Sequence, residues 1–199
     1  MRITILTILG LMNFLASCVT TDITDSSSIS FFKKEFLERD GCFMIVEIET
    51  GKIVDQYNIE RCKRRFPPMS TFKIPLVVMG FDSEYFKDVD QNIKWDGKKR
   101  SRAAVNRDQT PKTFINNSVI WVSRLIVNFL GEQSVQKYVE EFNYGNKKVE
   151  GDLNNFWLSK GSIKISAHEQ VQFLSQLWRL QIPLNRGTFN LTKKATFDR

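Results

Sequence analysis

The 199-residue sequence has a single histidine, His168, and three cysteines that lie far apart. No Cys/His cluster has the spacing of a zinc site, so the sequence argues against a zinc enzyme and predicts no metal. The glycine-rich loop that cradles phosphate groups in nucleotide-binding proteins is also missing. These absences leave no support for a metal-dependent or nucleotide-dependent activity.

The charge balance is basic, with 29 Lys and Arg against 22 Asp and Glu, which gives a net charge of +7. Such a charge suits anionic lipid or an anionic substrate, and a solvated basic surface is the alternative. Basic residues cluster at 61–65 and 98–102, but no interleaved aromatic residues indicate a nucleic-acid groove, so no nucleic-acid partner is expected. Because 42% of the residues are hydrophobic and 26% charged, the composition favours a globular domain with its own core.

The first 17 residues are typical of a secretion signal. Met1-Arg2 is a short basic region, and the apolar run from Ile3 to Leu15 is too short to span a bilayer. The end of this run, Leu15-Ala16-Ser17-Cys18, is similar to the bacterial lipobox, whose cysteine receives a lipid before cleavage. An ordinary signal peptide with unmodified Cys18 is the alternative. The sequence thus predicts export across the inner membrane to the periplasm as a lipid-anchored protein, with a polar tether over 18–30.

The exported location bears on the other two cysteines. Because that compartment is oxidising, Cys42 and Cys62 are candidates for a disulfide. Two free buried thiols are the competing interpretation, and the sequence leaves both open. No prediction of oligomeric state follows from the sequence.

Hydrophobic spacing predicts a mixture of helices and strands. An antiparallel hairpin is expected from two β-rich runs joined by a turn. The run that starts at Ser166 has Glu169 in capping-box spacing, so a helix should begin there, with His168 facing solvent or capping the first turn. The tail over 184–199 predicts neither strand nor helix. The expected elements are strands at 42–48 and 53–57 and helices at 31–39, 70–81, 117–130, 132–142 and 166–180.

A serine and a lysine lie one helical turn apart just after two prolines. Pro67 and Pro68 cannot extend a helix backwards, so Ser70 should open the helix and share a face with Lys73. The apolar run after Lys73 predicts a buried amine with a lowered pKa. A neutral amine can accept the hydroxyl proton, which is the chemistry of an acyl-transfer serine. Ser-x-x-Lys alone is a weak motif, and a surface helix would also produce it by chance.

Further motifs follow in a particular order, and together they resemble the class D, or oxacillinase-type, serine β-lactamases. That resemblance implies an α/β fold of the serine β-lactamase and penicillin-binding transpeptidase type, with a helical half and an antiparallel sheet, over residues 31–199. The matching segments are Pro68 to Pro75, Lys94-Trp95-Asp96-Gly97, Ser118, Tyr144-Gly145-Asn146, Phe156-Trp157-Leu158 and Ile165-Ser166-Ala167.

The resemblance also implies the roles of the site residues. Ser70 is expected to be the acylated nucleophile, and Lys73 the general base, carried as a carbamate (N6-carboxylysine) formed with carbon dioxide. Ser118 would pass a proton to the departing lactam nitrogen, and the indole of Trp157 would hold the carbamate. The expected partner is a β-lactam antibiotic, and no cofactor is expected beyond carbon dioxide or bicarbonate.

Six residues are expected to line this site, and one of them departs from the family pattern. Ile120 stands where the family commonly has valine, which adds a methylene beside Lys73. The expected lining residues are Phe72, Val119, Ile120, Tyr144, Gly145 and Asn146.

The larger departure is at the end of the sequence. In the family, a strand with the sequence Lys-[Ser/Thr]-Gly forms the far wall of the active site. This strand supplies the second N–H that stabilises the oxyanion and helps to hold the substrate carboxylate. No such triplet occurs before Arg199, so the sheet is expected to be incomplete and the protein truncated at its C-terminal end. Two alternatives to a hydrolase follow, namely a penicillin-binding sensor that is acylated without turnover and an inactive remnant.

Overall fold

The computed structural model describes residues 34, 36 and 39–197, and the chain divides into a unit of residues 1–35 and a unit of residues 36–199. The predicted signal peptide, Cys18, the polar tether and most of the helix predicted at 31–39 lie outside the described residues. Within the described part, no helix is long and apolar enough to cross a membrane.

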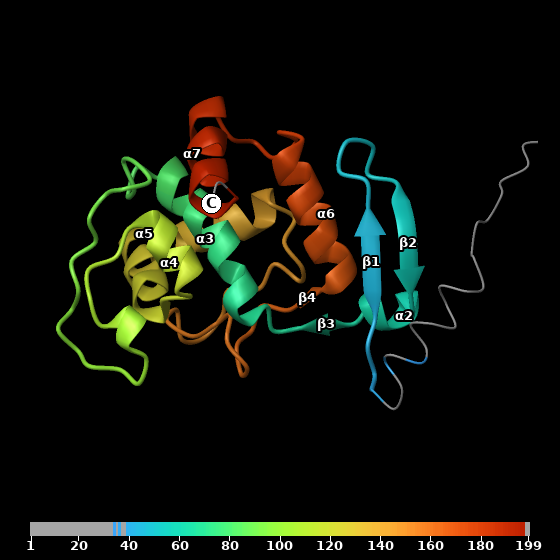
Figure 1. The fold of residues 1–199 in the computed structure, drawn as a ribbon, viewed down its shortest axis with the longest axis horizontal. Helices are drawn as coiled ribbons and strands as arrows, with labels where there is room; N and C mark the ends of the chain where they lie inside the picture. The colour runs from blue at the N-terminus through green and yellow to red at the C-terminus, as the bar shows by residue number, and fades with distance from the viewer. Residues whose placement is uncertain (1–33, 35, 37–38, 198–199) are drawn as a thin grey trace, which may run out of the picture. The chain divides into compact units, whose positions relative to one another are not determined.

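The predicted hairpin is present as β1 (Phe43–Val46) and β2 (Ile53–Tyr57), which pair antiparallel with Phe43 opposite Tyr57 (Figure 1). The turn requires a left-handed backbone at Gly51, where φ is 73°, and glycine adopts this conformation without strain. Cys42 and Cys62 form a disulfide with their Cα atoms 5.6 Å apart. The structure therefore favours the bonded form over two free thiols.

A second strand pair connects the hairpin to the helical part. After the short helix α2 (Ile59–Cys62), strand β3 (Arg65–Phe66) pairs antiparallel with β4 (Ile165–Ser166). This pair brings the segment before Ser70 beside the start of α6 (Ala167–Trp178). Strands and helices are thus combined as predicted, and the mixed α/β class is confirmed.

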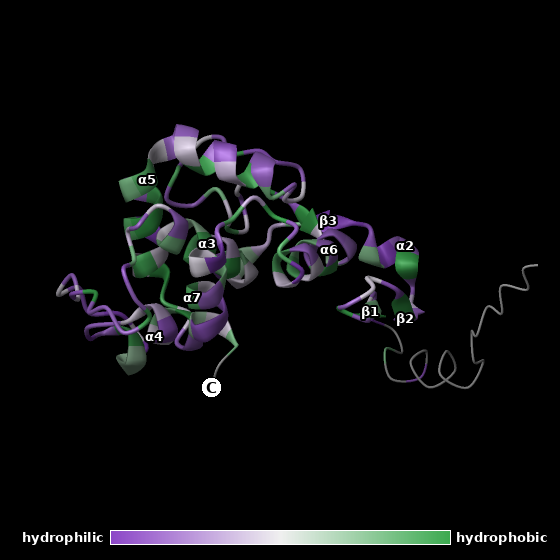
Figure 2. Cartoon of the chain, turned by 90° about the horizontal axis from the view of Figure 1, so that it is seen from above, coloured by the Kyte–Doolittle hydropathy of each residue, from purple (hydrophilic) through white to green (hydrophobic). Residues whose placement is uncertain are grey.

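The helical part is built around α3 (Lys73–Asp82), which contacts α4 (Pro111–Asn116), α5 (Ile120–Glu141) and α7 (Arg186–Thr196). Figure 2 shows α3 among these helices, whereas the connection between α3 and α4 is largely hydrophilic. The helices predicted at 117–130 and 132–142 are present as the two halves of α5, which are separated by a kink at the non-helical residue Gly131. The later start of α5 has a local cause, because Ser118 has a left-handed backbone with φ of 51°.

One prediction about the tail was wrong. Residues 184–199 were expected to form no element, but Arg186–Thr196 form α7. The side chain of Asn185 caps this helix by accepting a hydrogen bond of 2.8 Å from the Thr188 amide. The helix packs against α3 and α4 and buries Ala195. This packing adds to the stability of α7, because a helix of 11 residues is marginal on its own.

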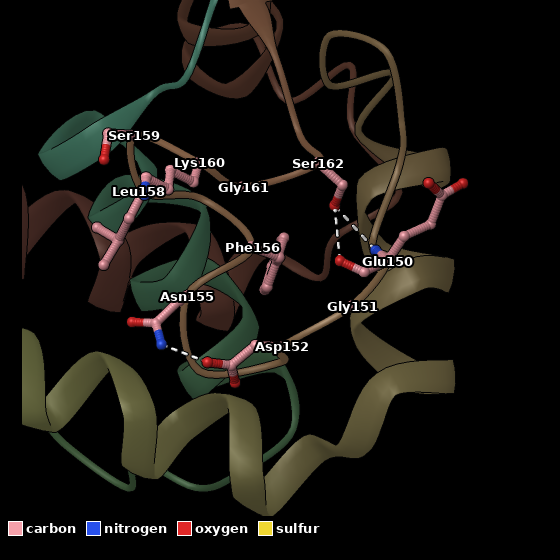
Figure 3. Close-up of a pocket in the computed structure, with 10 residues that line it drawn as sticks. All are labelled: Glu150, Gly151, Asp152, Asn155, Phe156, Leu158, Ser159, Lys160, Gly161 and Ser162. Atoms are coloured by element: carbon pink, nitrogen blue, oxygen red, sulfur yellow. Dashed lines mark hydrogen bonds between the residues drawn. The ribbon is translucent and has the colours of Figure 1, made fainter.

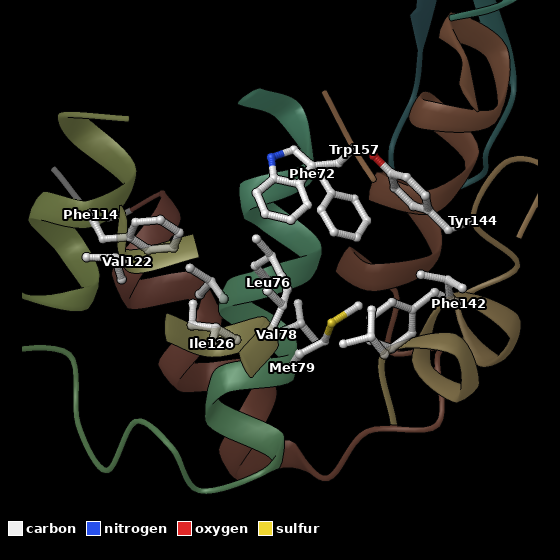
Figure 4. Packing of buried hydrophobic residues seen from close by; sticks show 14 of the residues in the cluster. Phe72, Leu76, Val78, Met79, Phe114, Val122, Ile126, Phe142, Tyr144 and Trp157 are labelled. Carbon is white, nitrogen blue, oxygen red and sulfur yellow. The ribbon is translucent and has the colours of Figure 1, made fainter. Parts of the chain in front are cut away.

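The core centres on α3 and an aromatic cluster at its N-terminal end (Figure 4). Phe72 is fully buried, and its ring centroid lies 5.2 Å from that of Phe156, 5.5 Å from that of Tyr144 and 5.9 Å from that of Trp157. Each such ring contributes about 1.5–3 kcal/mol through burial. The core therefore fixes the start of α3, where the serine and lysine lie.

Candidate active site

Ser70 lies in a 3₁₀ turn, η1 (Met69–Phe72), immediately before α3. The backbone enters this turn through Met69, whose φ of 52° is left-handed, and the Met69 amide donates a hydrogen bond of 3.0 Å to the Trp157 carbonyl. Thr71 closes the turn because both its amide and its hydroxyl donate to the Pro68 carbonyl. Ser70 is thereby held at the surface in the 3₁₀ turn, whereas the sequence predicted that it would open the α-helix itself.

Lys73 is the first residue of α3, and only 3% of it is exposed. Its Nζ donates a hydrogen bond of 3.3 Å to the Oγ of Ser70. Burial, followed by the positive charge of Arg102, lowers the pKa of Lys73 to about 8. The structure therefore agrees with the predicted buried amine beside the serine.

Ser118 reaches the same serine from the connection between α4 and α5. Its Oγ donates a hydrogen bond of 3.1 Å to the Oγ of Ser70, from 48 residues further along the sequence. The left-handed backbone of Ser118 is secured in part by its amide, which donates 3.1 Å to the Ile115 carbonyl. One hydroxyl thus has an amine on one side and a second hydroxyl on the other.

A cavity of about 420 Å³ opens at this group. Four of its lining residues, namely Arg100, Ser101, Arg102 and Val105, come from the connection between α3 and α4. The full lining is Ser70, Arg100, Ser101, Arg102, Val105, Ser118, Ile120 and Trp121.

A larger cavity, of about 660 Å³, lies elsewhere, inside the loop formed by residues 150–162 (Figure 3). It is lined by none of the three residues Ser70, Lys73 and Ser118. We therefore assign the reaction site to the smaller cavity, since it is lined by Ser70 and by the Ser118 that is hydrogen-bonded to it. His168 lines neither of these cavities but a third one beside β1 and α6.

Trp157 is fully buried behind the 3₁₀ turn. Its indole stacks on the ring of Phe72 with an angle of 20° between the planes. The indole Nε1 has no hydrogen-bond acceptor among the described residues. A buried donor without an acceptor costs about 1–3 kcal/mol, so this N–H is suited to a further acceptor close to the start of α3.

Of the six residues predicted to line the site, Ile120 alone is among those lining the cavity in the described part of the protein. Phe72 and Val119 are fully buried in the core instead. Each of these two residues lies within two positions of a serine of the site, but its side chain packs in the core instead of facing the cavity. These side chains therefore support the turns that carry the polar groups.

The Tyr144-Gly145-Asn146 segment also lies outside the cavity lining. The buried Tyr144 hydroxyl donates 2.9 Å to Gln170 Oε1, and burial raises its pKa. Gly145 approaches the Lys164 carbonyl so closely that a Cβ atom would lie 2.1 Å from it. Asn146 Nδ2 donates 2.9 Å to the Ser162 carbonyl. These contacts hold the segment against residues 162–164 and α6, and none of its three residues lines the Ser70 cavity.

The arginines of the cavity were missed as site residues, although the sequence shows a basic cluster at 98–102. Arg100 pairs with Asp96 at 2.5 Å, and the Trp95 amide donates 2.9 Å to Asp108. These contacts lie within the connection between α3 and α4, and Arg102 is the residue of this connection that bonds to the Ser118 carbonyl. The spacing of the basic residues in the sequence does not indicate that they lie close to Ser118, because only the folded connection brings them there.

This fold and this serine, lysine and serine group define a protein class. The family model described as the penicillin binding protein transpeptidase domain matches residues 41–184, so the chain belongs to that family. The matching solved structures include the class D β-lactamase of Bacillus subtilis, with a TM-score of 0.76, 29% identity and coverage of 82% of this chain and 68% of that one. The structure of the BPu1 β-lactamase matches with a TM-score of 0.77 and 33% identity, and the match covers 82% of this chain and 69% of that one.

The curated relatives narrow the class further. The chain is 33% identical over 187 residues to β-lactamase OXA-1 of Escherichia coli, which covers 89% of this chain and 66% of the relative. It is 33% identical over 159 residues to β-lactamase OXA-20 of Pseudomonas aeruginosa, and this match covers 80% of this chain and 59% of the relative. The chain is thus a member of the class D serine β-lactamases, as the motifs predicted, and it spans less than two thirds of these two relatives.

Proposed function

We propose that this protein hydrolyses β-lactams through an acyl-serine intermediate. The observation that carries the proposal is the pair of hydrogen bonds converging on the Ser70 hydroxyl, 3.3 Å from Lys73 Nζ and 3.1 Å from Ser118 Oγ. In acylation, the Ser70 Oγ loses its proton to the base at Lys73 and attacks the lactam carbonyl carbon. The carbon–nitrogen bond breaks, and Ser118 passes a proton to the leaving nitrogen. Water then cleaves the ester and restores the Ser70 hydroxyl.

The proposal includes a carbamate on Lys73. Two features of the site support it. The first is the pKa of Lys73, which is lowered to about 8, because only a neutral amine combines with carbon dioxide. The second is the buried indole N–H of Trp157, which has no acceptor among the described residues and would suit a carbamate oxygen. When formed, the carbamate supplies a better proton acceptor for both half-reactions. Lys73 would carry it and Trp157 would hold it.

Mass spectrometry of the full-length protein with benzylpenicillin tests the function directly. We expect one penicilloyl adduct per molecule in a quenched reaction, together with hydrolysis of the chromogenic cephalosporin nitrocefin that bicarbonate increases. Ser70→Ala should lose both signals. Ser101→Ala is the matched control, because Ser101 lines the same cavity without a role in the proposed proton transfers.

The other outcomes separate the alternatives. One adduct per molecule without turnover would support a penicillin-binding sensor. A cooperatively folded protein that forms no adduct would overturn the proposal. Absence of an adduct with non-cooperative unfolding would support an inactive remnant.

We also propose that the protein is exported to the periplasm and anchored by a lipid on Cys18. The support is the basic start, the short apolar run and the lipobox-like ending in the sequence. After growth of a bacterial host with radioactive palmitate, we expect the protein to carry the label and to be found in the membrane fraction. If Cys18→Ser is labelled to the same extent as the unchanged protein, the anchor is not on Cys18.

A further inference from the structure

Arg102 is bonded to the backbone that carries Ser118. Its Nη2 donates a hydrogen bond of 2.7 Å to the Asn117 carbonyl and a second of 3.2 Å to the Ser118 carbonyl. Arg102 itself comes from the connection between α3 and α4, just before the 3₁₀ turn η2 (Ala103–Val105). A single guanidinium therefore ties two consecutive carbonyls of one segment to a different segment.

The segment that it ties has an unfavourable backbone conformation. Ser118 has φ of 51°, in the left-handed region that costs a residue with a Cβ about 1–2 kcal/mol. Such a conformation persists when surrounding contacts determine it. From this conformation the Ser118 Oγ reaches the Oγ of Ser70 at 3.1 Å. The contacts of Arg102 thus support the geometry on which the second hydroxyl depends.

The charge of Arg102 also remains uncompensated at the cavity. Arg100, on the same wall, pairs with Asp96, whereas Arg102 forms no ion pair within the described residues. The charge of Arg102 acts on Lys73 and lowers its pKa. The Lys73 amine donates to the Ser70 hydroxyl, the Ser118 hydroxyl donates to that same serine, and the Tyr144 hydroxyl bonds to Gln170. A positive charge facing a buried amine favours its neutral form.

We propose that Arg102 is a positioning residue of this site, which holds the Asn117 and Ser118 carbonyls so that the Ser118 hydroxyl stays bonded to Ser70 and which presents its charge to the Ser70 cavity. The proposal rests on the function proposed above, because its role is in acylation. It adds a residue that no motif of the sequence indicates.

The test compares three variants by the rate of penicilloyl adduct formation as a function of pH. In Arg102→Met we expect a roughly tenfold slower reaction at pH 7, because the serine pair loses its alignment. We also expect the pH midpoint of the rate to move upward, because loss of the positive charge raises the pKa of Lys73. Arg102→Lys keeps the charge and should keep the midpoint while losing part of the rate. Arg107→Met is the matched control, from an exposed position on the same connection that does not line the cavity.

These readouts separate positioning from a general structural role. Loss of folding alone would lower the rate without moving the midpoint, and the melting temperature of each variant identifies such a loss. The proposal is overturned if Arg102→Met matches Arg107→Met in both rate and midpoint.

A second measurement does not depend on acylation. In buffer depleted of bicarbonate, so that Lys73 carries no carbamate, NMR titration of ¹³Cε-labelled lysine reports the Lys73 amine directly, with Lys73→Met used to assign its signal. The Lys73 titration should move upward in Arg102→Met and stay in place in Arg107→Met. If the unchanged protein forms no adduct, the proposed function fails, and this titration still decides the role of the Arg102 charge. Equal titrations in the two variants would overturn that role.

Discussion

The Nζ of Lys73 lies 3.3 Å from the Oγ of Ser70, although only 3% of the lysine is exposed and the serine is open to solvent. The base is thus screened from water while its partner faces the cavity. The boundary between the 3₁₀ turn and α3 produces this arrangement, because it falls between Phe72 and Lys73. The two groups are within hydrogen-bond reach, and burial of the amine favours the neutral form that can accept the hydroxyl proton.

Lys73 should reduce the stability of the folded protein at neutral pH. Its folded pKa of about 8 is below its ordinary value of 10.5, so between these values the unfolded state binds the extra proton and stability rises with pH. We therefore expect Lys73→Met to raise the free energy of unfolding at pH 7 by up to about 3 kcal/mol relative to the unchanged protein. This gain in stability should shrink as the pH approaches 10.5. Urea unfolding at pH 7 and at pH 10 measures this difference. A gain that does not change with pH would contradict the assignment.

Trp157→Phe should separate carbamate formation from packing. The substitution removes a buried N–H that has no acceptor among the described residues, and we expect a carbamate signal in ¹³C NMR with labelled bicarbonate to fall roughly tenfold. Trp121→Phe provides the control for stability, because the Trp121 Nε1 donates 2.9 Å to the Val105 carbonyl. Trp121→Phe should therefore be the more destabilising of the two by about 1 kcal/mol. An unchanged carbamate signal in Trp157→Phe would refute the role of the indole.

Acid should weaken the link between β3 and α6. Arg65 Nε donates 3.0 Å to each carboxylate oxygen of Glu169, and the Ser166 amide donates 3.0 Å to Oε2. Burial raises the pKa of Glu169, but the hydrogen bonds from Arg65 and Ser166 outweigh it and lower the pKa to about 2. The stabilisation is present above the ordinary pKa of about 4.5 and is lost as pH falls toward 2.

We therefore expect the unchanged protein to lose about 2–3 kcal/mol across that window, relative to Glu169→Gln. Urea midpoints at pH 5, 4 and 3 measure the loss. Glu60→Gln is the control, since its pair with Lys63 is exposed and should contribute less than about 1 kcal/mol. Parallel pH curves for the unchanged protein and Glu169→Gln would show that the link is not a stabilising one.

The disulfide should stabilise the fold without affecting the chemistry. It closes a segment with a sequence separation of 20 residues, which corresponds to about 3 kcal/mol from the restricted unfolded state. The double substitution Cys42→Ala with Cys62→Ala should lower the free energy of unfolding by that amount and change the rate of adduct formation less than twofold. Alkylation with and without reductant, followed by mass spectrometry, reports the bonded state. A large loss of acylation in a folded double variant would mean that the hairpin helps to shape the site.

Much of the fold could be predicted because its signals are local. The β1 and β2 strands follow from β-rich runs and turn residues, and α6 from the capping box in which Ser166 accepts from the Glu169 amide at 3.1 Å. The helix α7 was missed although its signals are also local, because Asn185 caps its start and Lys193 and Lys194 lie in its last turn. Its packing against α3 and α4, which stabilises so short a helix, could not be predicted from local patterns.

By itself, the sequence determined that Ser70 and Lys73 meet, since one helical turn separates them and two prolines precede them. The family resemblance placed Ser118 in the site, but only the tertiary structure showed the contact of its hydroxyl with Ser70 from 48 residues away and the bond from Arg102 to its backbone. The reason is physical, because spacing along a helix specifies neighbours within a turn, whereas contacts between distant segments depend on how the core packs the loops between them.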